Sequence, residues 1–257
     1  HSSASPRCPE WEKLFKEASK LLYDATQTQI RFEKIKLMNN CNNASAKADV
    51  QIYNDNQGAN AHTGGFGTSG LRIRLSQTHK TVTTGTGAGD RGQFGLIHEM
   101  GHYFFGLLDE YQDKTGANTA DAYCIDQNGT TASIMDGGTT VSPANRRTEF
   151  CTSANHRAGH TEQCQKRAVG GVDYEDADAW NFLAAYVKEK YNITLTVPSA
   201  TPTSSTTGHV DPAFEYYDCG IRAVTCIDRS GSMYGSQLTM AKGGANSFIN
   251  LAAESDY

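Results

Sequence analysis

Apolar residues recur along the chain at two spacings, and each spacing predicts a different kind of element. Residues 9–26 carry apolar residues at i, i+3, i+4 and i+7, which is the repeat of an α-helix with one buried face. A second helix of this kind is expected over residues 175–191. The apolar positions of the two helices are Trp11, Leu14, Phe15, Ala18, Leu21, Leu22 and Ala25, and Trp180, Leu183, Ala184, Val187 and Tyr191.

Residues 31–38, 48–53 and 71–76 instead alternate apolar and polar residues, which is the repeat of a β-strand. The Gly-rich stretch between the second and third of these segments is expected to be a loop, with His62 in solvent. A further helix is expected from about residue 143 to 154. Helices and strands mixed in this order predict an α+β or α/β fold.

Residues 197–212 are rich in Pro, Ser and Thr and show neither repeat. Such composition is typical of a linker between domains. We therefore expect one domain over residues 1–196 and a second over residues 213–257. A chain of 257 residues is long enough for this organisation.

The first motif with clear chemistry is His-Glu-x-x-His at residues 98–102. A capping box formed by Asp90 and Gln93, followed by apolar residues, predicts a helix here. On a helix, His98 and His102 lie one turn apart on the same face, so their imidazoles can bind one Zn²⁺. Glu99 can then take a proton from a water at the metal. Two packed or exposed histidines beside a helical Glu are the alternative interpretation.

A third zinc ligand has to come from outside this helix. Gly106 can end the helix in a left-handed conformation and turn the chain back toward the metal. The next short polar ligand is Asp109, and a carboxylate oxygen is an acceptable zinc ligand. Glu110 is the competing candidate for the same role.

Met135 lies in the sequence TTASIMDGG, which predicts a tight polar turn. This turn resembles the Met-turn that lies beneath the metal in metzincin proteases. An ordinary buried Met beside a turn is the alternative. Acidic residues between Asp109 and Asp126 could bind Ca²⁺, but they follow no EF-hand spacing, and a solvated loop is expected there.

A second motif, DRSGSM, begins at Asp228. It follows an apolar run at residues 221–227 and precedes a predicted helix at residues 236–253. At the end of a strand, Asp228, Ser230 and Ser232 would present one carboxylate and two hydroxyls to a hard cation such as Mg²⁺. An ordinary strand, turn and helix with a Ser-rich cap is the alternative.

Composition narrows the classes of function. The net charge of −5 and the scattered Lys and Arg residues give no basic patch for nucleic acid, and no apolar run is long enough to cross a membrane. Seven cysteines without a CxxC pair favour disulfides in an oxidising compartment. Cys151 and Cys164 could pair, and Cys226 is expected to be the free thiol. Asn43, Asn128 and Asn192 begin N-x-S/T sequons, which fit secretion.

The pattern HExxHxxxGxxDEY at residues 98–111 resembles that of the calcium-activated chloride channel regulator (CLCA) family. The order of other segments is also typical of that family: FKEASKLLYDAT and KADVQIY come before this pattern, and TASIM, TEFC and the late SGSM come after it. The resemblance therefore covers nearly the whole chain. It implies a metzincin-like mixed sheet with a zinc-binding helix and Met-turn, followed by the strand and helix that begin a von Willebrand factor A domain. It also implies self-cleavage and a secreted or cell-surface protein.

The same resemblance implies that residues 71–76 form an edge strand that pairs with an extended peptide substrate. It also assigns Asp228, Ser230 and Ser232 to a metal-ion-dependent adhesion site. The Thr and second Asp that complete such a site in that family do not occur before Tyr257, so we expect a partial site.

We therefore expect a zinc metalloendopeptidase that acts on protein or peptide substrates, its own chain among them. The alternative is a secreted or cell-surface binding protein or channel regulator. In that case the protease domain would act only on its own chain, and the A domain would bind partners through a divalent cation. The sequence Pro-Arg-Cys8 also resembles the cysteine switch of matrix metalloproteinases, although half of a disulfide is the favoured interpretation of Cys8.

Overall fold

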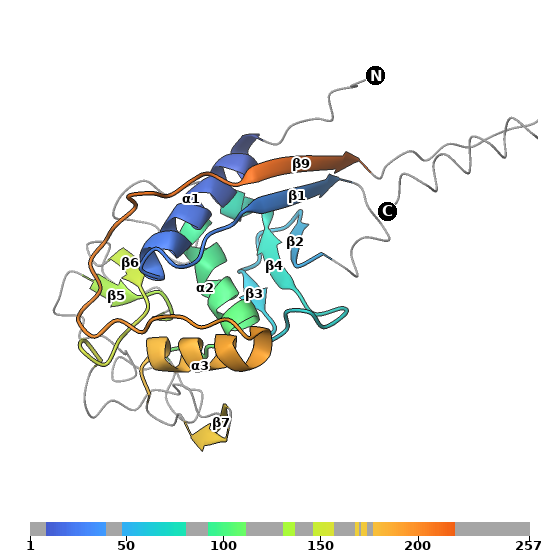
Figure 1. The fold of residues 1–257 in the computed structure, drawn as a ribbon. Coiled ribbons are helices and arrows are strands. Elements are labelled where there is room, and N and C mark those ends of the chain that lie inside the picture. Colours follow the sequence, from blue (N-terminus) through green and yellow to red (C-terminus); the bar gives the residue numbers. More distant parts are fainter. Residues whose placement is uncertain are drawn as a thin grey trace, which may run out of the picture. The chain divides into compact units, whose positions relative to one another are not determined.

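The computed structural model describes residues 9–39, 48–80, 92–111, 131–136, 146–156, 168–169, 171–173 and 177–218. Over these residues the protein is a mixed α+β structure with three α-helices and small sheets (Figure 1). The helices are α1 (Pro9–Ala25), α2 (Gly92–Phe105) and α3 (Ala179–Tyr191), with a 3₁₀-helix, η2, at Gln77–Lys80. The strands are β1 (Lys34–Asn39), β2 (Val50–Tyr53), β3 (Asn60–Ala61), β4 (Ile73–Ser76), β5 (Thr131–Ser133), β6 (Arg146–Glu149), β7 (Ala168–Val169), β8 (Val172–Asp173) and β9 (Ala213–Asp218).

The chain divides into two compact units. The larger unit comprises Cys8–Ile35 and Ser45–Phe214, and it contains the three helices and the predicted zinc ligands. The smaller unit comprises His1–Arg7, Lys36–Ala44 and Glu215–Tyr257. Strands β1 and β9 pair with each other. No described helix is long and apolar enough to cross a membrane.

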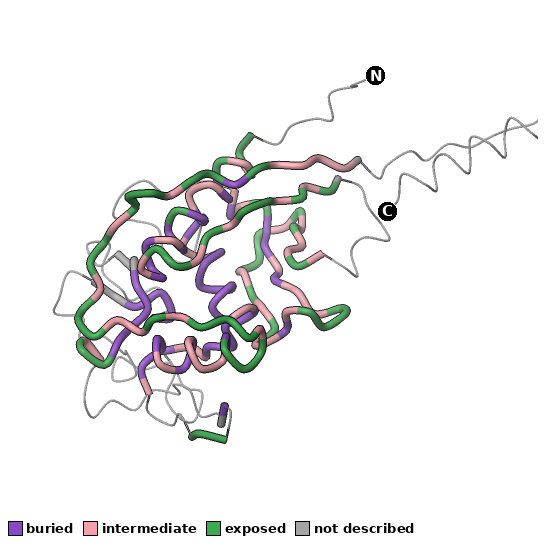
Figure 2. The backbone as a smooth tube through the Cα atoms, viewed as in Figure 1, coloured by how far each residue is buried: buried purple, intermediate pink, exposed green. Residues whose placement is uncertain are grey.

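The three helices form where the sequence predicts them, α1 and α3 from the apolar repeat and α2 from the apolar residues around the His-Glu-x-x-His motif. Of the apolar residues predicted for the buried face of α1, all but Trp11 are buried, namely Leu14, Phe15, Ala18, Leu21, Leu22 and Ala25, whereas Trp11 is half-buried. This face packs against α2. Helix α3 has Asp178 as its N-cap, whose Oδ1 accepts the N–H of Asn181 at 3.0 Å, and Asn192 as its C-cap, with φ of 57°. Helix α2 contacts α1, α3, β3 and β4 and is buried along nearly its whole length (Figure 2).

The largest sheet among the described residues has the strand order β2–β4–β3. Strand β4 runs parallel to β2, with Val50 opposite Ile73, and antiparallel to β3, with Asn60 opposite Arg74. The prediction of an edge strand at residues 71–76 is therefore wrong, because β4 is the central strand. The short β3 lies in the Gly-rich stretch that was expected to be a loop. His62 follows it and is exposed, as predicted.

Residues 146–149 correct another expectation. The helix predicted over residues 143–154 is instead β6, which pairs in parallel with β5. The pairing continues beyond the strands, since the N–H of Ile134 donates to the carbonyl of Glu149 at 2.7 Å. Thr148 and Phe150 are residue types that favour strands, and the pairing partner lies many residues earlier in the chain.

The predicted linker follows the surface of α1. Its backbone and side chains bond to the helix and to the turn after it: Thr203 to Gln27, Ser204 and Ser205 to Asp24, Thr207 to Tyr23, and His209 to Ser19. Thr196, which directly precedes the linker, bonds to Gln29. Residues 197–212 are attached to the larger unit by hydrogen bonds between polar groups. Such attachment does not require apolar periodicity in the sequence. The predicted second domain, residues 213–257, stays a prediction, since its residues beyond 218 lie outside the described part of the chain.

Asp24 tests whether these bonds stabilise the larger unit. Its carboxylate is buried, accepts the hydroxyl of Ser204 at 2.8 Å and accepts the N–H of Ser205. We expect Asp24→Ala to lower the free energy of unfolding by about 1–3 kcal/mol, because donors would lose their acceptor. Urea unfolding measures this change. The control is Asp211→Ala, because Asp211 is 57% exposed in its pair with Lys16, and its loss should cost less than about 1 kcal/mol. Equal effects of the two substitutions would contradict the assignment.

Candidate metal centre

Helix α2 carries two of the predicted ligands and ends in the way that the sequence predicts. Gly106 has φ of 67°, and its N–H donates to the carbonyl of His102 at 3.1 Å. The next residue, Leu107, donates its N–H to the carbonyl of Gly101 at 3.0 Å. The chain therefore folds back along the last turn of α2, which brings Asp109 beside the two histidines.

A tight turn at residues 133–136 supports the same site. The turn is closed by Asp136, whose Oδ2 accepts the N–H of Ser133 at 2.9 Å. Within the turn, the carbonyl of Ile134 accepts the Nδ1–H of His98 at 2.9 Å, and the carbonyl of Met135 accepts the N–H of Glu110 at 3.0 Å. The turn thus fixes both the helix and the loop that carries the third ligand.

Met135 lies directly against the helix. Its side chain is fully buried, and a Cβ added to Gly101 would lie only 2.4 Å from its sulfur. Gly101 comes one residue before His102, so the Met side chain packs against the segment between the two histidines. The predicted tight turn is present, and its Met lies next to the ligand-bearing helix.

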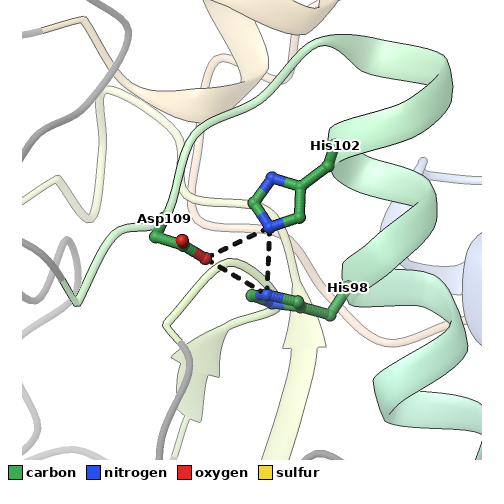
Figure 3. A group of neighbouring side chains, drawn as sticks. All are labelled: His98, His102 and Asp109. Atoms are coloured by element: carbon green, nitrogen blue, oxygen red, sulfur yellow. Dashed lines mark hydrogen bonds and ion pairs between the residues drawn. The ribbon is translucent and has the colours of Figure 1, made fainter. Parts of the chain in front are cut away.

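The three predicted ligand atoms converge on one point (Figure 3). Nε2 of His98 and Nε2 of His102 lie 3.2 Å apart. Oδ1 of Asp109 is 3.2 Å from the first nitrogen and 3.1 Å from the second. Among the described residues, these three side chains form the one group whose ligand atoms could hold a metal ion, and Glu99 and Glu110 are not part of it.

Hydrogen bonds on the far side of each imidazole set its tautomer. A carbonyl oxygen only accepts, so Nδ1 of His98 carries the hydrogen toward Ile134, and Nδ1 of His102 carries the hydrogen toward Leu107 at 2.7 Å. Each neutral ring therefore directs a lone pair from Nε2 toward Asp109. Backbone carbonyls commonly orient metal-binding histidines in this way.

Charge and burial act against each other in this group. Burial lowers the pKa of His98, but the carboxylates of Asp109 and Glu99 outweigh it and raise that pKa to about 9. Burial likewise raises the pKa of Asp109, but the two imidazoles outweigh it and hold the pKa well below its usual range. A proton on His98 therefore stabilises the group, and a bound cation would displace that proton.

The residues fit a divalent transition metal. Oδ1 of Asp109 is buried and faces Nε2 of both histidines, so a bound cation would satisfy it together with both imidazole lone pairs. Tetrahedral zinc with ligand bonds of about 2.0–2.1 Å separates its ligand atoms by roughly 3.3 Å, close to the observed spacing. Two imidazoles and one carboxylate are also a donor set that leaves a coordination position free for a reactant.

The two glutamates near the ligands have different surroundings. Glu99 is buried on α2 next to His98, and its charge helps to raise the pKa of that histidine. Glu110 is fully buried, and its Oε1 lies 3.4 Å from Sγ of Cys151. Of the two candidates for the third ligand, the structure therefore brings Asp109 to the histidines and directs Glu110 elsewhere.

Tyr111 is a residue of this site that the sequence did not single out. Its ring stacks near that of His98, with centroids 6.2 Å apart and an angle of 26° between the planes. Its position two residues after Asp109 was the available signal. The carbonyls of Leu107 and Ile134, which orient the histidines, carry no signal in the sequence because any residue supplies a carbonyl.

Several predicted features lie outside the described residues. These are Asp228, Ser230 and Ser232 with the surrounding strand and helix, the capping residue Asp90, Cys8, Cys164, Cys226, and the sequons at Asn43 and Asn128. Cys151 forms a disulfide, and its predicted pairing with Cys164 stays a prediction. Asn192 is exposed, whereas His156 is half-buried with Nδ1 3.7 Å from Sγ of Cys151.

Comparisons of the chain with protein-family models, curated proteins and solved structures gave no match. The function has to be inferred from the metal centre itself and from the motifs that surround it.

Asp109 provides the direct test of the metal centre. We expect the parent protein, incubated with zinc and dialysed, to retain one equivalent, and Asp109→Ala to lose it, because the variant lacks the one carboxylate in the group. Elemental analysis by mass spectrometry measures the metal content. Asp55→Ala is the matched control, since Asp55 instead pairs with Arg74 in the sheet. Retention of zinc by Asp109→Ala together with its loss from Glu110→Gln would assign the third ligand to Glu110.

Gly106 tests the turn that delivers the third ligand. An Ala there would keep a left-handed φ at a cost of about 1–2 kcal/mol, and its Cβ would lie 2.8 Å from the ring of Tyr186. We expect Gly106→Ala to lose at least that much free energy of unfolding and to bind zinc more weakly. Calorimetry and zinc titration measure the two effects. Gly58→Ala is the control, because its Cβ would meet no atom within 4 Å. Unchanged stability of Gly106→Ala would contradict this account.

Proposed function

We propose that this protein is a zinc-dependent endopeptidase with a metzincin-like catalytic domain. The observation that carries the proposal is the convergence of three ligand atoms, Nε2 of His98, Nε2 of His102 and Oδ1 of Asp109, at mutual distances of 3.1–3.2 Å. The buried Met135 against the same helix supports the metzincin-like assignment.

Glu99, the residue beside the ligands, is the reason for favouring zinc over other metals. Two histidines and a carboxylate also bind iron(II) in oxygenases, so the donor set alone leaves both metals open. Glu99 directly follows the first histidine of a His-Glu-x-x-His helix, where a general base serves hydrolysis. An oxygenase has no need of a carboxylate at that position, and we therefore favour hydrolytic chemistry.

Each side chain then has a defined task in peptide hydrolysis. Zinc bound here would lower the pKa of a water and polarise the scissile carbonyl. His98, His102 and Asp109 would hold the ion, and the carbonyls of Ile134 and Leu107 keep the two imidazoles in the orientation that this requires. Glu99 accepts the proton of the attacking water and passes it to the amine that leaves.

The resemblance to the CLCA family supports a more specific version of the proposal. The chain would cleave itself, and it would act outside the cell or at its surface. The disulfide at Cys151 supports an oxidising compartment. Hydrolysis of other proteins and hydrolysis of its own chain use the same site, so the choice between them requires an experiment.

Glu99→Gln separates proton transfer from metal binding. We expect the variant to bind zinc as the parent does, because Glu99 lies outside the ligand group, and to cleave peptides at least about 10²-fold more slowly. Cleavage of casein and of the protein's own chain, followed by mass spectrometry, measures the rate. Glu10→Gln, which alters an exposed carboxylate on α1, is the control. Cleavage at the parent rate by zinc-loaded Glu99→Gln would refute the assigned role.

The same variant distinguishes the two substrates. Glu99→Gln is incubated as substrate with a catalytic amount of the active parent. Cleavage under these conditions, together with cleavage of casein, would support an endopeptidase that acts on other molecules. A parent that is cut only in its own chain, at a rate independent of protein concentration, would instead support the self-processing binding protein.

A further inference from the structure

The imidazole of His98 has two aromatic neighbours as well as its hydrogen bond. The ring of His102 meets it nearly edge-on, with centroids 4.8 Å apart and an angle of 87°. The ring of Tyr111 lies nearly parallel to it at 6.2 Å and 26°. The hydrogen bond from Nδ1 to Ile134 fixes one direction of the ring, whereas contacts with its faces limit its tilt.

Three consecutive residues attach the loop after α2 to the centre, and each uses a different kind of contact. Oδ1 of Asp109 faces both histidine nitrogens. The N–H of Glu110 donates to the carbonyl of Met135. The ring of Tyr111 then stacks near His98 and so connects the end of this loop with the first ligand of the helix.

We propose that Tyr111 is a positioning residue of the metal centre. Its ring holds the imidazole of His98 and the Asp109 loop in one arrangement before the ion binds. The inference rests on the metal-binding part of the proposed function. It assigns the effect to the flat face of the aromatic ring, and the comparison of the Ala and Phe variants tests this assignment against a role of the hydroxyl.

The surroundings of Tyr111 favour this role over ordinary core packing. The side chain is half-buried, whereas the core around α2 consists of fully buried residues such as Leu96, Ile97 and Leu107. Truncation of a half-buried ring removes less apolar area from the interior than truncation of a core residue does. The expected effect is therefore on the orientation of the ligands, with a smaller effect on global stability.

The experiment compares the parent with Tyr111→Ala and Tyr111→Phe. Zinc affinity is measured by competition with a chromogenic chelator on protein stripped of metal. We expect the dissociation constant to rise about tenfold in Tyr111→Ala, within the range that residues supporting metal ligands show, and to stay within about twofold in Tyr111→Phe. The visible absorption of the cobalt-substituted protein should change in Tyr111→Ala and be restored in Tyr111→Phe.

Tyr53→Ala is the matched control. Tyr53 is also half-buried and packs its ring against a flat partner, with Arg74 at 4.5 Å from the centroid, but it lies on β2 in the sheet. Its removal should leave zinc affinity and the cobalt spectrum unchanged, even where it lowers the melting temperature as much as Tyr111→Ala does.

Two results would overturn the inference. In the first, Tyr111→Ala keeps the affinity and the cobalt spectrum of the parent. In the second, Tyr111→Phe loses as much affinity as Tyr111→Ala, which would transfer the role from the ring to the hydroxyl. A parent that binds zinc but cleaves no peptide would refute the proposed peptidase function and would leave this comparison intact.

Discussion

The mutual approach of three lone pairs is the constraint on which the site depends. Two imidazole nitrogens and one carboxylate oxygen lie within 3.2 Å of one another, and such atoms repel unless a proton or a cation lies between them. A flexible protein would relieve this repulsion by turning the side chains apart. Helix α2 prevents such movement because it is buried along nearly all of its length and contacts two other helices and the sheet.

Backbone carbonyls supply the remaining restraint on the ligands. Ile134 and Leu107 each accept a hydrogen from one imidazole, and Met135 accepts the N–H that follows Asp109. Two of these carbonyls belong to the turn at residues 133–136. The pairing of β5 with β6 continues into this turn. The strand pair therefore acts on the metal centre although it contributes no ligand side chain to it.

The sequence predicted those parts of the protein that local patterns determine. The apolar repeat identified α1 and α3, the His-Glu-x-x-His motif with its apolar neighbours identified α2, and the spacing of His98 and His102 placed both on one face. Gly106 correctly predicted the turn that brings Asp109 back. The errors concern long-range pairing. Strand β6 lies where a helix is predicted, because its pairing with β5 leaves no signal in the local sequence. The edge position of residues 71–76 was implied by the family resemblance, whereas β4 pairs with the two-residue strand β3 as well as with β2.

Residues 197–212 are a second case in which the local sequence pattern does not predict the contacts that form in the fold. Their composition is typical of a linker because it contains little that a core could bury. The structure attaches them to α1 and to the turn after it through hydrogen bonds to side chains such as Gln27 and the buried Asp24. Apolar periodicity does not report such bonds. Tyr111 and the orienting carbonyls escaped prediction for a related reason, since their partners are defined only after the chain has folded back.

The choice between adjacent carboxylates follows from the same geometry. Asp109 and Glu110 are both acidic and both near the helix end, so chemistry alone leaves either as the third ligand. Glu110 is committed by its surroundings, with its N–H on Met135 and its Oε1 near the sulfur of Cys151. Cys151 in turn accepts the N–H groups of Ala179 and Trp180 at the start of α3, through its sulfur and its carbonyl. Burial of Glu110 against this disulfide-bonded residue therefore ties the loop to α3, and the shorter side chain before it is the one left facing the histidines.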